Sequence, residues 1–241
     1  MALYRDRGIV LRTYKLGEAD RIVSIITEER GKVRAVAKGV RKTKSRFGGR
    51  LEPTGHLALQ LYEGRELDIV TQVESIQAYR HIREDLDRLS KAIVLLEAVD
   101  HLAHEGSPAP HLYRMLAGAL AELDRSDSAM LVPAFLLKLL AAEGFGPDLD
   151  VCVVGGKADA DLDLVALDID RNGAVCIEHR RGVPVSTEAF AVMRAVMGGG
   201  LKDVLDVAEG PVTHEVDALV GRMYEHHVER RLRSAHVLDR A

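Results

Sequence analysis

Two cysteines and one histidine are the residues of this chain best suited to hold a metal ion. Cys176 and His179 are separated by two residues, and Cys152 lies earlier in the same Asp-rich region. A zinc knuckle closes a tetrahedron with two such pairs of ligands across a hairpin. Gly155 occupies the place of the second ligand of the first pair, so a fourth ligand is missing unless an aspartate just before Cys152 supplies it. We therefore expect no bound metal, with Cys152, Cys176 and His179 as the zinc candidates.

A second kind of chemistry, the binding of a polyanion, is indicated by residues 30–50. This segment holds nine Lys or Arg and no acidic residue, whereas the whole chain has a formal charge of −4, so the rest carries −13. Such a block is typical of proteins that bind nucleic acid. A solubilising face or a disordered tail is the alternative. The predicted contacts are Lys32, Arg34, Lys38, Arg41, Lys42, Lys44, Arg46 and Arg50.

The surroundings of the basic segment favour a folded binding site. Val33, Val36 and Val40 are interleaved with the cations, and strand-like segments flank the run. Phe47 is its only aromatic residue, and the whole chain has 4% aromatic residues and no Trp. Phe47 either stacks on a base or anchors the loop, and the low aromatic content limits any mechanism that relies on a wide stacking platform for bases.

The first eighty residues predict five short strands without helical crossovers, at 7–13, 21–27, 32–38, 56–62 and 67–73. Glycines and a proline separate them. In 32–38 the alternation puts Val33, Ala35 and Ala37 on one face and three cations on the other. Five such strands favour a small closed barrel, and the oligonucleotide-binding (OB) fold is the natural candidate.

From about residue 82 the hydrophobic period becomes helical. Leu86 to Leu102 predict one amphipathic helix, and others are expected at 110–124, 130–143, 187–197 and 212–233. Between them, 148–184 predicts an inserted β-hairpin, in which Asn172-Gly173 offers the positive φ angles of a tight turn. The sequence thus predicts an α+β chain of two domains: an OB-fold β-barrel (1–80), then an α-helical domain (81–241) with a small, degenerate zinc-finger-like hairpin.

Other functional classes lack their signatures. We find no nucleophile elbow and no phosphate-binding loop of the P-loop type, so we expect a protein that is not an enzyme. The sequence has no run of eighteen apolar residues, so it predicts no membrane-spanning helix. The first residues do not predict a secretory signal. We expect a cytoplasmic, nucleoid-associated protein.

The N-terminal sequence resembles the RecO family of bacterial DNA repair and recombination proteins. The residues that carry this resemblance are Gly17-Glu18-x-Asp20, Thr27-x-x-x-Gly31, Ala37-Lys38-Gly39-Val40-Arg41-Lys42 and Leu51-x-Pro53. The remaining two-thirds of the chain resembles the family in layout: a helical region, a cysteine-bearing hairpin and closing helices.

The resemblance implies an OB-fold barrel on an α-helical domain that binds single- and double-stranded DNA and anneals complementary strands. It also implies help in loading RecA onto DNA coated by single-strand DNA-binding protein, together with RecR. Some family members carry two Cys-x-x-Cys pairs that hold zinc, from which this chain departs at Gly155. The alternatives are an RNA-binding or ribosome-associated OB-fold module and a protein–protein adaptor.

Overall fold

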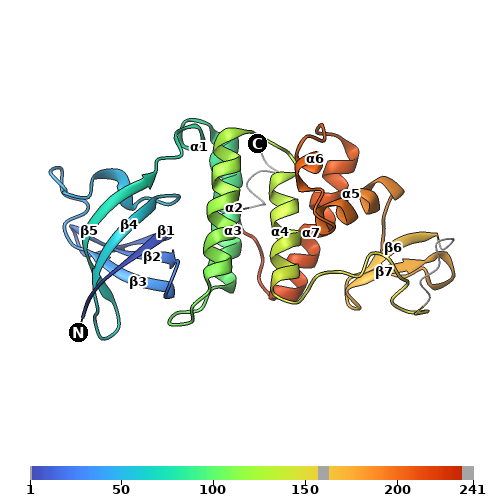
Figure 1. The fold of residues 1–241 in the computed structure, drawn as a ribbon, viewed down its shortest axis with the longest axis horizontal. Coiled ribbons are helices and arrows are strands. Elements are labelled where there is room, and N and C mark those ends of the chain that lie inside the picture. Colours follow the sequence, from blue (N-terminus) through green and yellow to red (C-terminus); the bar gives the residue numbers. More distant parts are fainter. Residues whose placement is uncertain (1, 157–162, 235–241) are drawn as a thin grey trace. The chain divides into compact units, whose positions relative to one another are not determined.

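The computed structural model describes residues 2–156 and 163–234, and its contacts divide the chain into two compact units. Unit 1 comprises Met1–Ser126 together with the C-terminal segment from Arg233, and unit 2 comprises Asp127–Leu232. Figure 1 shows the strand-rich N-terminal part in blue and teal and the later helices in yellow to red. The α+β class is confirmed: a five-stranded barrel is followed by helices and a small sheet.

The barrel of unit 1 is closed in the order β1-β2-β3-β5-β4. Its strands are β1 (Leu3–Leu16), β2 (Asp20–Thr27), β3 (Gly31–Ala37), β4 (His56–Tyr62) and β5 (Asp68–Gln77). All neighbouring pairs are antiparallel except β3 and β5, which are parallel and complete the closure. This confirms the predicted OB-like barrel.

Alternating side chains fill the barrel interior, as the period of two requires. Val10, Val23, Ile25, Ala35 and Leu57 are buried in one core cluster. Strand β1 is the longest, and its pairing with β2 shifts register between Val10 and Arg12. Such a bulge bends the strand and lets it pair with both β2 and β4 around the barrel.

Three helices complete unit 1: α1 (Arg80–Glu84), α2 (Leu86–Leu102) and α3 (Pro110–Arg125). The Asp85 carboxylate caps α2 by accepting hydrogen bonds from two backbone N–H groups, and Pro110 occupies the first turn of α3. Helices α2 and α3 pack on each other and contact β1, and α3 also contacts β2. Gly31 shows how close this packing is, because a Cβ there would lie 1.8 Å from the Ser107 carbonyl oxygen, and its φ is +71°.

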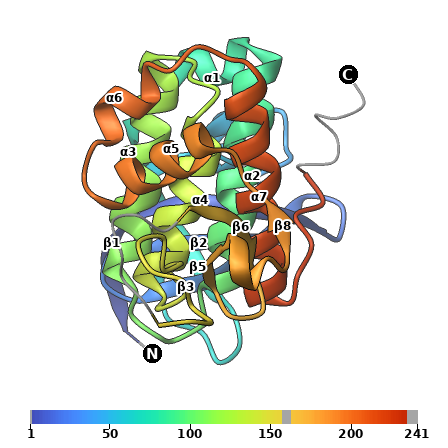
Figure 2. The ribbon, with the colours of Figure 1, turned by 90° about the vertical axis from the view of Figure 1, so that its right-hand side faces the viewer.

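Unit 2 contains α4 (Leu131–Ala142), α5 (Thr187–Met197), α6 (Leu201–Leu205) and α7 (Pro211–Val228). The unit also has a three-stranded sheet in the order β7-β6-β8, from β6 (Leu164–Asp168), β7 (Gly173–Cys176) and β8 (Val183–Pro184). Figure 2 shows β6 and β8 near α7. The predicted hairpin is therefore β6–β7. The last helix ends earlier than predicted, because Glu229 adopts the left-handed conformation with φ of +52°.

The hairpin turn differs from the predicted tight Asn172-Gly173 turn. Asp168 pairs with Gly173, so four residues connect the strands, and of the two turn residues only Asn172 has a positive φ. Gly173 is needed for a different reason: a Cβ there would lie 2.3 Å from Val153 Cγ1 and 2.8 Å from the Asp148 carbonyl oxygen. The insert predicted at 148–184 includes residues 157–162, which lie outside the described part.

Within the described ranges, none of the helices is both long enough and apolar enough to cross a membrane. The predicted domain boundary near residue 80 falls inside unit 1, because α1–α3 pack with the barrel. The domain limits stay a prediction.

Candidate nucleic-acid interface

The segment between β3 and β4 carries most of the predicted binding residues, and we call Lys38–Arg50 the basic loop. Six of its side chains are cationic and exposed. Among the residues that the structure describes, none of the six forms an ion pair with a carboxylate. These six are Lys38, Arg41, Lys42, Lys44, Arg46 and Arg50.

Hydrogen bonds fix the start of the basic loop to the turn between β1 and β2. The Gly39 N–H donates to Asp20 Oδ1 at 2.7 Å, and the Arg41 N–H donates to the Ala19 carbonyl oxygen at 3.0 Å. Arg41 Nη1 also donates to the Gly17 carbonyl oxygen at 3.4 Å. The loop therefore presents its charges from a defined backbone.

Phe47 anchors the other half of the loop. The sequence left open whether this ring stacks on a base or packs on the barrel, and in the structure it is 1% exposed within the barrel core. Leu51, which ends the short 3₁₀ helix η1 (Gly48–Leu51), is buried in the same cluster. With Phe47 in the core, the basic loop offers charge and no aromatic surface.

Lys32 and Arg34 lie in a different setting from the other predicted contacts. Lys32 Nζ lies 3.0 Å from Asp100 Oδ1 and donates to the Asp100 carbonyl oxygen at 2.8 Å, and its side chain is 16% exposed. Arg34 forms an ion pair with Glu105 at 3.6 Å. Both acidic partners come from α2 or the residues that follow it. The cationic face predicted for strand 32–38 is thus partly covered and neutralised, and our proposal does not use these two residues.

The buried Asp100 also contacts a second cation and a hydroxyl group. Arg12 Nε on β1 lies 3.0 Å from Asp100 Oδ2, and the Ser24 hydroxyl on β2 donates to Asp100 Oδ1 at 3.5 Å. Arg12 also reaches Glu97 at 3.5 Å. This network joins three strands to α2, which gives Lys32 a structural role that alternation along one strand could not reveal.

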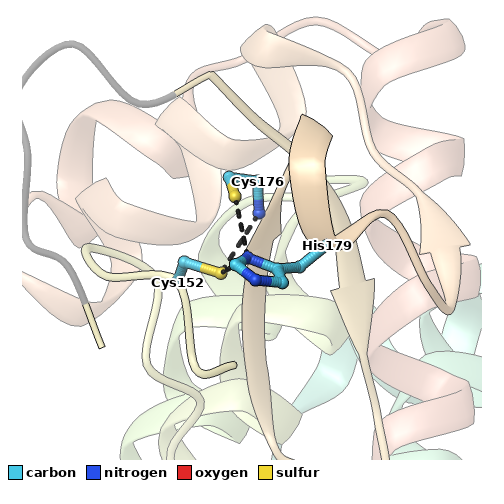
Figure 3. A group of neighbouring side chains, drawn as sticks. All are labelled: Cys152, Cys176 and His179. Carbon is cyan, nitrogen blue, oxygen red and sulfur yellow. Dashed lines mark hydrogen bonds between the residues drawn. The ribbon is translucent and has the colours of Figure 1, made fainter. Parts of the chain in front are cut away.

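The zinc candidates Cys152, Cys176 and His179 come together in unit 2, as Figure 3 shows. Their three ligand atoms lie within 4.8 Å of one another. His179 Nδ1 is 3.5 Å from Cys152 Sγ and 3.3 Å from Cys176 Sγ. Three side chains at these separations can contact one ion, which is three of the four ligands of a closed structural zinc site.

Gly155, which stands in the sequence where the fourth ligand is missing, lies beside this cluster. A Cβ at this position would lie 2.9 Å from His179 Cε1, 3.3 Å from His179 Nδ1 and 3.9 Å from Cys152 Sγ. Burial alone would raise the pKa of the Cys152 thiol, but backbone N–H groups of Cys176, Gly155 and Val154 lower it to about 6. A soft cation would be held by two thiolates and one imidazole, with its last ligand from outside this set. The absence of a bound metal stays a prediction.

The small sheet has its own apolar packing beside this cluster. Cys152, Cys176, Ala166 and Val175 are buried together, with Leu164 packed against them. Backbone hydrogen bonds tie the preceding segment to β7, from Val153 N–H to the Ala174 carbonyl oxygen and from Ala174 N–H to the Asp148 carbonyl oxygen. The sheet therefore has cohesive contacts besides the cysteine–histidine cluster.

Two family models match the chain along nearly its whole length. The model described as "Recombination protein O N terminal" matches residues 1–79, and "Recombination protein O C terminal" matches residues 83–236. The chain is also 41% identical over 250 residues to the DNA repair protein RecO of Cutibacterium acnes, covering 100% of both chains. The proteins of that name in Bifidobacterium adolescentis and Frankia casuarinae are 42% and 41% identical, over 99% and 100% of this chain and 100% of their own.

Proposed function

This chain belongs to the RecO family of DNA repair proteins, and from that premise we propose that it acts in DNA repair by binding DNA through the basic loop. We propose that it binds single- and double-stranded DNA, anneals complementary strands and helps to load RecA onto DNA coated by single-strand DNA-binding protein. In the proposed reaction it works with RecR and performs no catalytic step.

One observation carries the proposal: six exposed cations without carboxylate partners in the described structure follow one another along a fixed loop. Phosphate contacts supply affinity that is independent of base sequence. An acidic remainder of the chain disfavours other binding orientations, because like charges repel the DNA backbone.

The same surface suits annealing. Two complementary strands can pair only if their base edges stay free, so a protein that promotes pairing should hold phosphates and leave bases uncovered. Phe47 is buried, and the loop has no other ring on which a base could stack. Charge neutralisation then brings two polyanions together without fixing either set of bases.

Charge reversal tests the proposal. The variant Arg41→Glu, Lys42→Glu, Lys44→Glu should lose DNA affinity by well over tenfold and keep its fold, because all three side chains are exposed. The matched control is Arg114→Glu, Lys202→Glu, Arg222→Glu, which makes the same change in net charge at exposed positions outside the loop. Fluorescence anisotropy with a labelled oligonucleotide measures both variants.

Annealing and loading are measured separately on complementary oligonucleotides coated by single-strand DNA-binding protein, with and without RecR. The loop variant should anneal more slowly than the control. Equal losses in the loop and control variants would show that only net charge matters. Preferred binding to structured RNA without annealing would instead support an RNA-binding module.

A further inference from the structure

A groove on the barrel lies at the end of the basic loop. Its volume is about 320 Å³, which is at the small end of the range for ligand sites. Its walls come from η1, from β4 and β5, and from α1, all within unit 1. The residues that matter for binding are Gly48, Gly49, Arg50, Ser75, Gln77 and Arg83.

Among the residues that the structure describes, no acidic side chain lines this groove. Arg50 and Arg83 are both exposed, and within the described ranges neither forms an ion pair. Arg50 Nη1 donates to the Phe47 carbonyl oxygen at 3.2 Å, so its guanidinium is held in place by the loop backbone. Two guanidinium groups with free donors and no nearby carboxylate form a site for phosphate.

The glycines leave the backbone of this wall uncovered. A Cβ at Gly49 would meet nothing within 4 Å, and one at Gly48 would meet only Arg50 Nη1 at 3.9 Å. Ser75 and Gln77 on β5 both line the groove, and their exposed side chains can donate hydrogen bonds. A sugar–phosphate chain can therefore approach closely and find donors on the opposite wall.

A larger groove on the same barrel provides the contrast. It has a volume of about 610 Å³ and is also lined by two arginines, Arg5 and Arg7. Its walls carry four carboxylates, however, from Asp6, Glu28, Glu29 and Glu74. The net charge of its lining is negative, so this groove repels a polyanion despite its size.

We propose that single-stranded DNA bound to the basic loop continues into the smaller groove, where Arg50 and Arg83 contact phosphates of the backbone. The inference rests on the function proposed above and adds a contact from α1, outside the N-terminal basic segment. Arg50 belongs to both the loop and the groove, which makes the path continuous.

The test compares Arg83→Gln with Arg80→Gln, an exposed arginine three residues earlier that does not line the groove. One phosphate contact on a single strand contributes about −0.7 to the slope of log K against log salt. At 50 mM salt, this contribution raises the affinity by about eightfold relative to 1 M salt. Arg83→Gln should lose about this factor and Arg80→Gln should stay near the parent. Arg83→Lys should keep most of the affinity, because it retains the charge.

The neutral loop variant Arg41→Gln, Lys42→Gln, Lys44→Gln is measured in the same experiment. If that variant loses binding while Arg83→Gln and Arg80→Gln have equal affinities for single-stranded DNA, the groove contact is refuted and the proposed function still stands. If the parent itself shows no salt-dependent binding to DNA, both proposals fail. Thermal unfolding of each variant shows whether a loss of affinity comes from a loss of fold.

Discussion

Salt should weaken the binding of single-stranded DNA by an amount that counts the cations in contact. The basic loop presents six exposed cations that form no ion pair with a carboxylate of the described residues. Each phosphate neutralised on a single strand contributes about −0.7 to the slope of log K against log salt. The six loop contacts alone give a slope of about −4, to which the Arg83 contact proposed above would add about −0.7. Between 50 and 200 mM salt, a slope of about −4 lowers the affinity by about 250-fold.

Neutralising half of these cations should halve the slope. The variant Arg41→Gln, Lys42→Gln, Lys44→Gln removes three contacts, so its slope should be about −2 and its affinity should fall only about 16-fold over the same salt range. Anisotropy titrations at four or more salt concentrations give both slopes. Glutamine keeps a polar side chain at each position, and all three side chains are exposed, so the stability of the fold should change little.

The base composition of the oligonucleotide is varied in the same experiment. Without an aromatic side chain in the loop available for stacking, poly-pyrimidine and mixed-sequence oligonucleotides should bind within a few-fold of each other at fixed salt. A slope near −1 together with strong sequence preference would mean that bases are read directly, and the annealing mechanism would be refuted.

Three further predictions concern the rest of the molecule. Lys32→Gln should lower the free energy of unfolding in urea by about 1–2 kcal/mol, because Asp100 loses a buried partner, and should leave the affinity for DNA within about twofold of the parent. Gly155→Cys should bind zinc at least about tenfold more tightly than Gly155→Ser in a chelator competition, since both add the same Cβ and only the thiol supplies a fourth soft ligand. Equal affinities would show that the fourth ligand position is not at residue 155. Burial, assisted by Arg7, lowers the pKa of His56 below its usual value of 6.5, so the folded state favours the neutral ring. The free energy of unfolding should therefore fall as the pH drops below about 6.5. In urea titrations, His56→Gln should make the free energy of unfolding depend less on pH over this range.

The barrel could be predicted because its strands alternate between a packed interior and an exposed face. That period is local, so the sequence alone shows it for 32–38 or 56–62. Elements too short for a period escaped prediction, among them the two-residue β8 and the five-residue helices α1 and α6. The end of α7 was missed because a glutamate, and neither glycine nor proline, takes the positive φ there.

The site shows a different limit. Alternation places Lys32 and Lys38 on one strand face, and no feature of residues 30–50 distinguishes them. What separates them is Asp100, which comes 68 residues after Lys32 and binds it only once α2 has packed on the barrel. Arg83 presents the converse case, because it is one of two arginines on a short helix of mixed charge, and only tertiary packing places it in the lining of the groove. A local charge count therefore finds the loop but does not define its edges.

The position of Phe47 links fold and function more directly than any single cation. Its burial anchors the middle of the loop to the barrel core, and the same packing removes the ring from contact with bases. Arg46 lies over its ring, with the guanidinium carbon 4.8 Å from the ring centre, and Arg50 donates to its carbonyl oxygen. One buried aromatic side chain thus positions two of the proposed phosphate contacts. Because a ring that stacked on bases would compete with pairing, a loop whose aromatic residue packs in the core supports the proposed annealing activity.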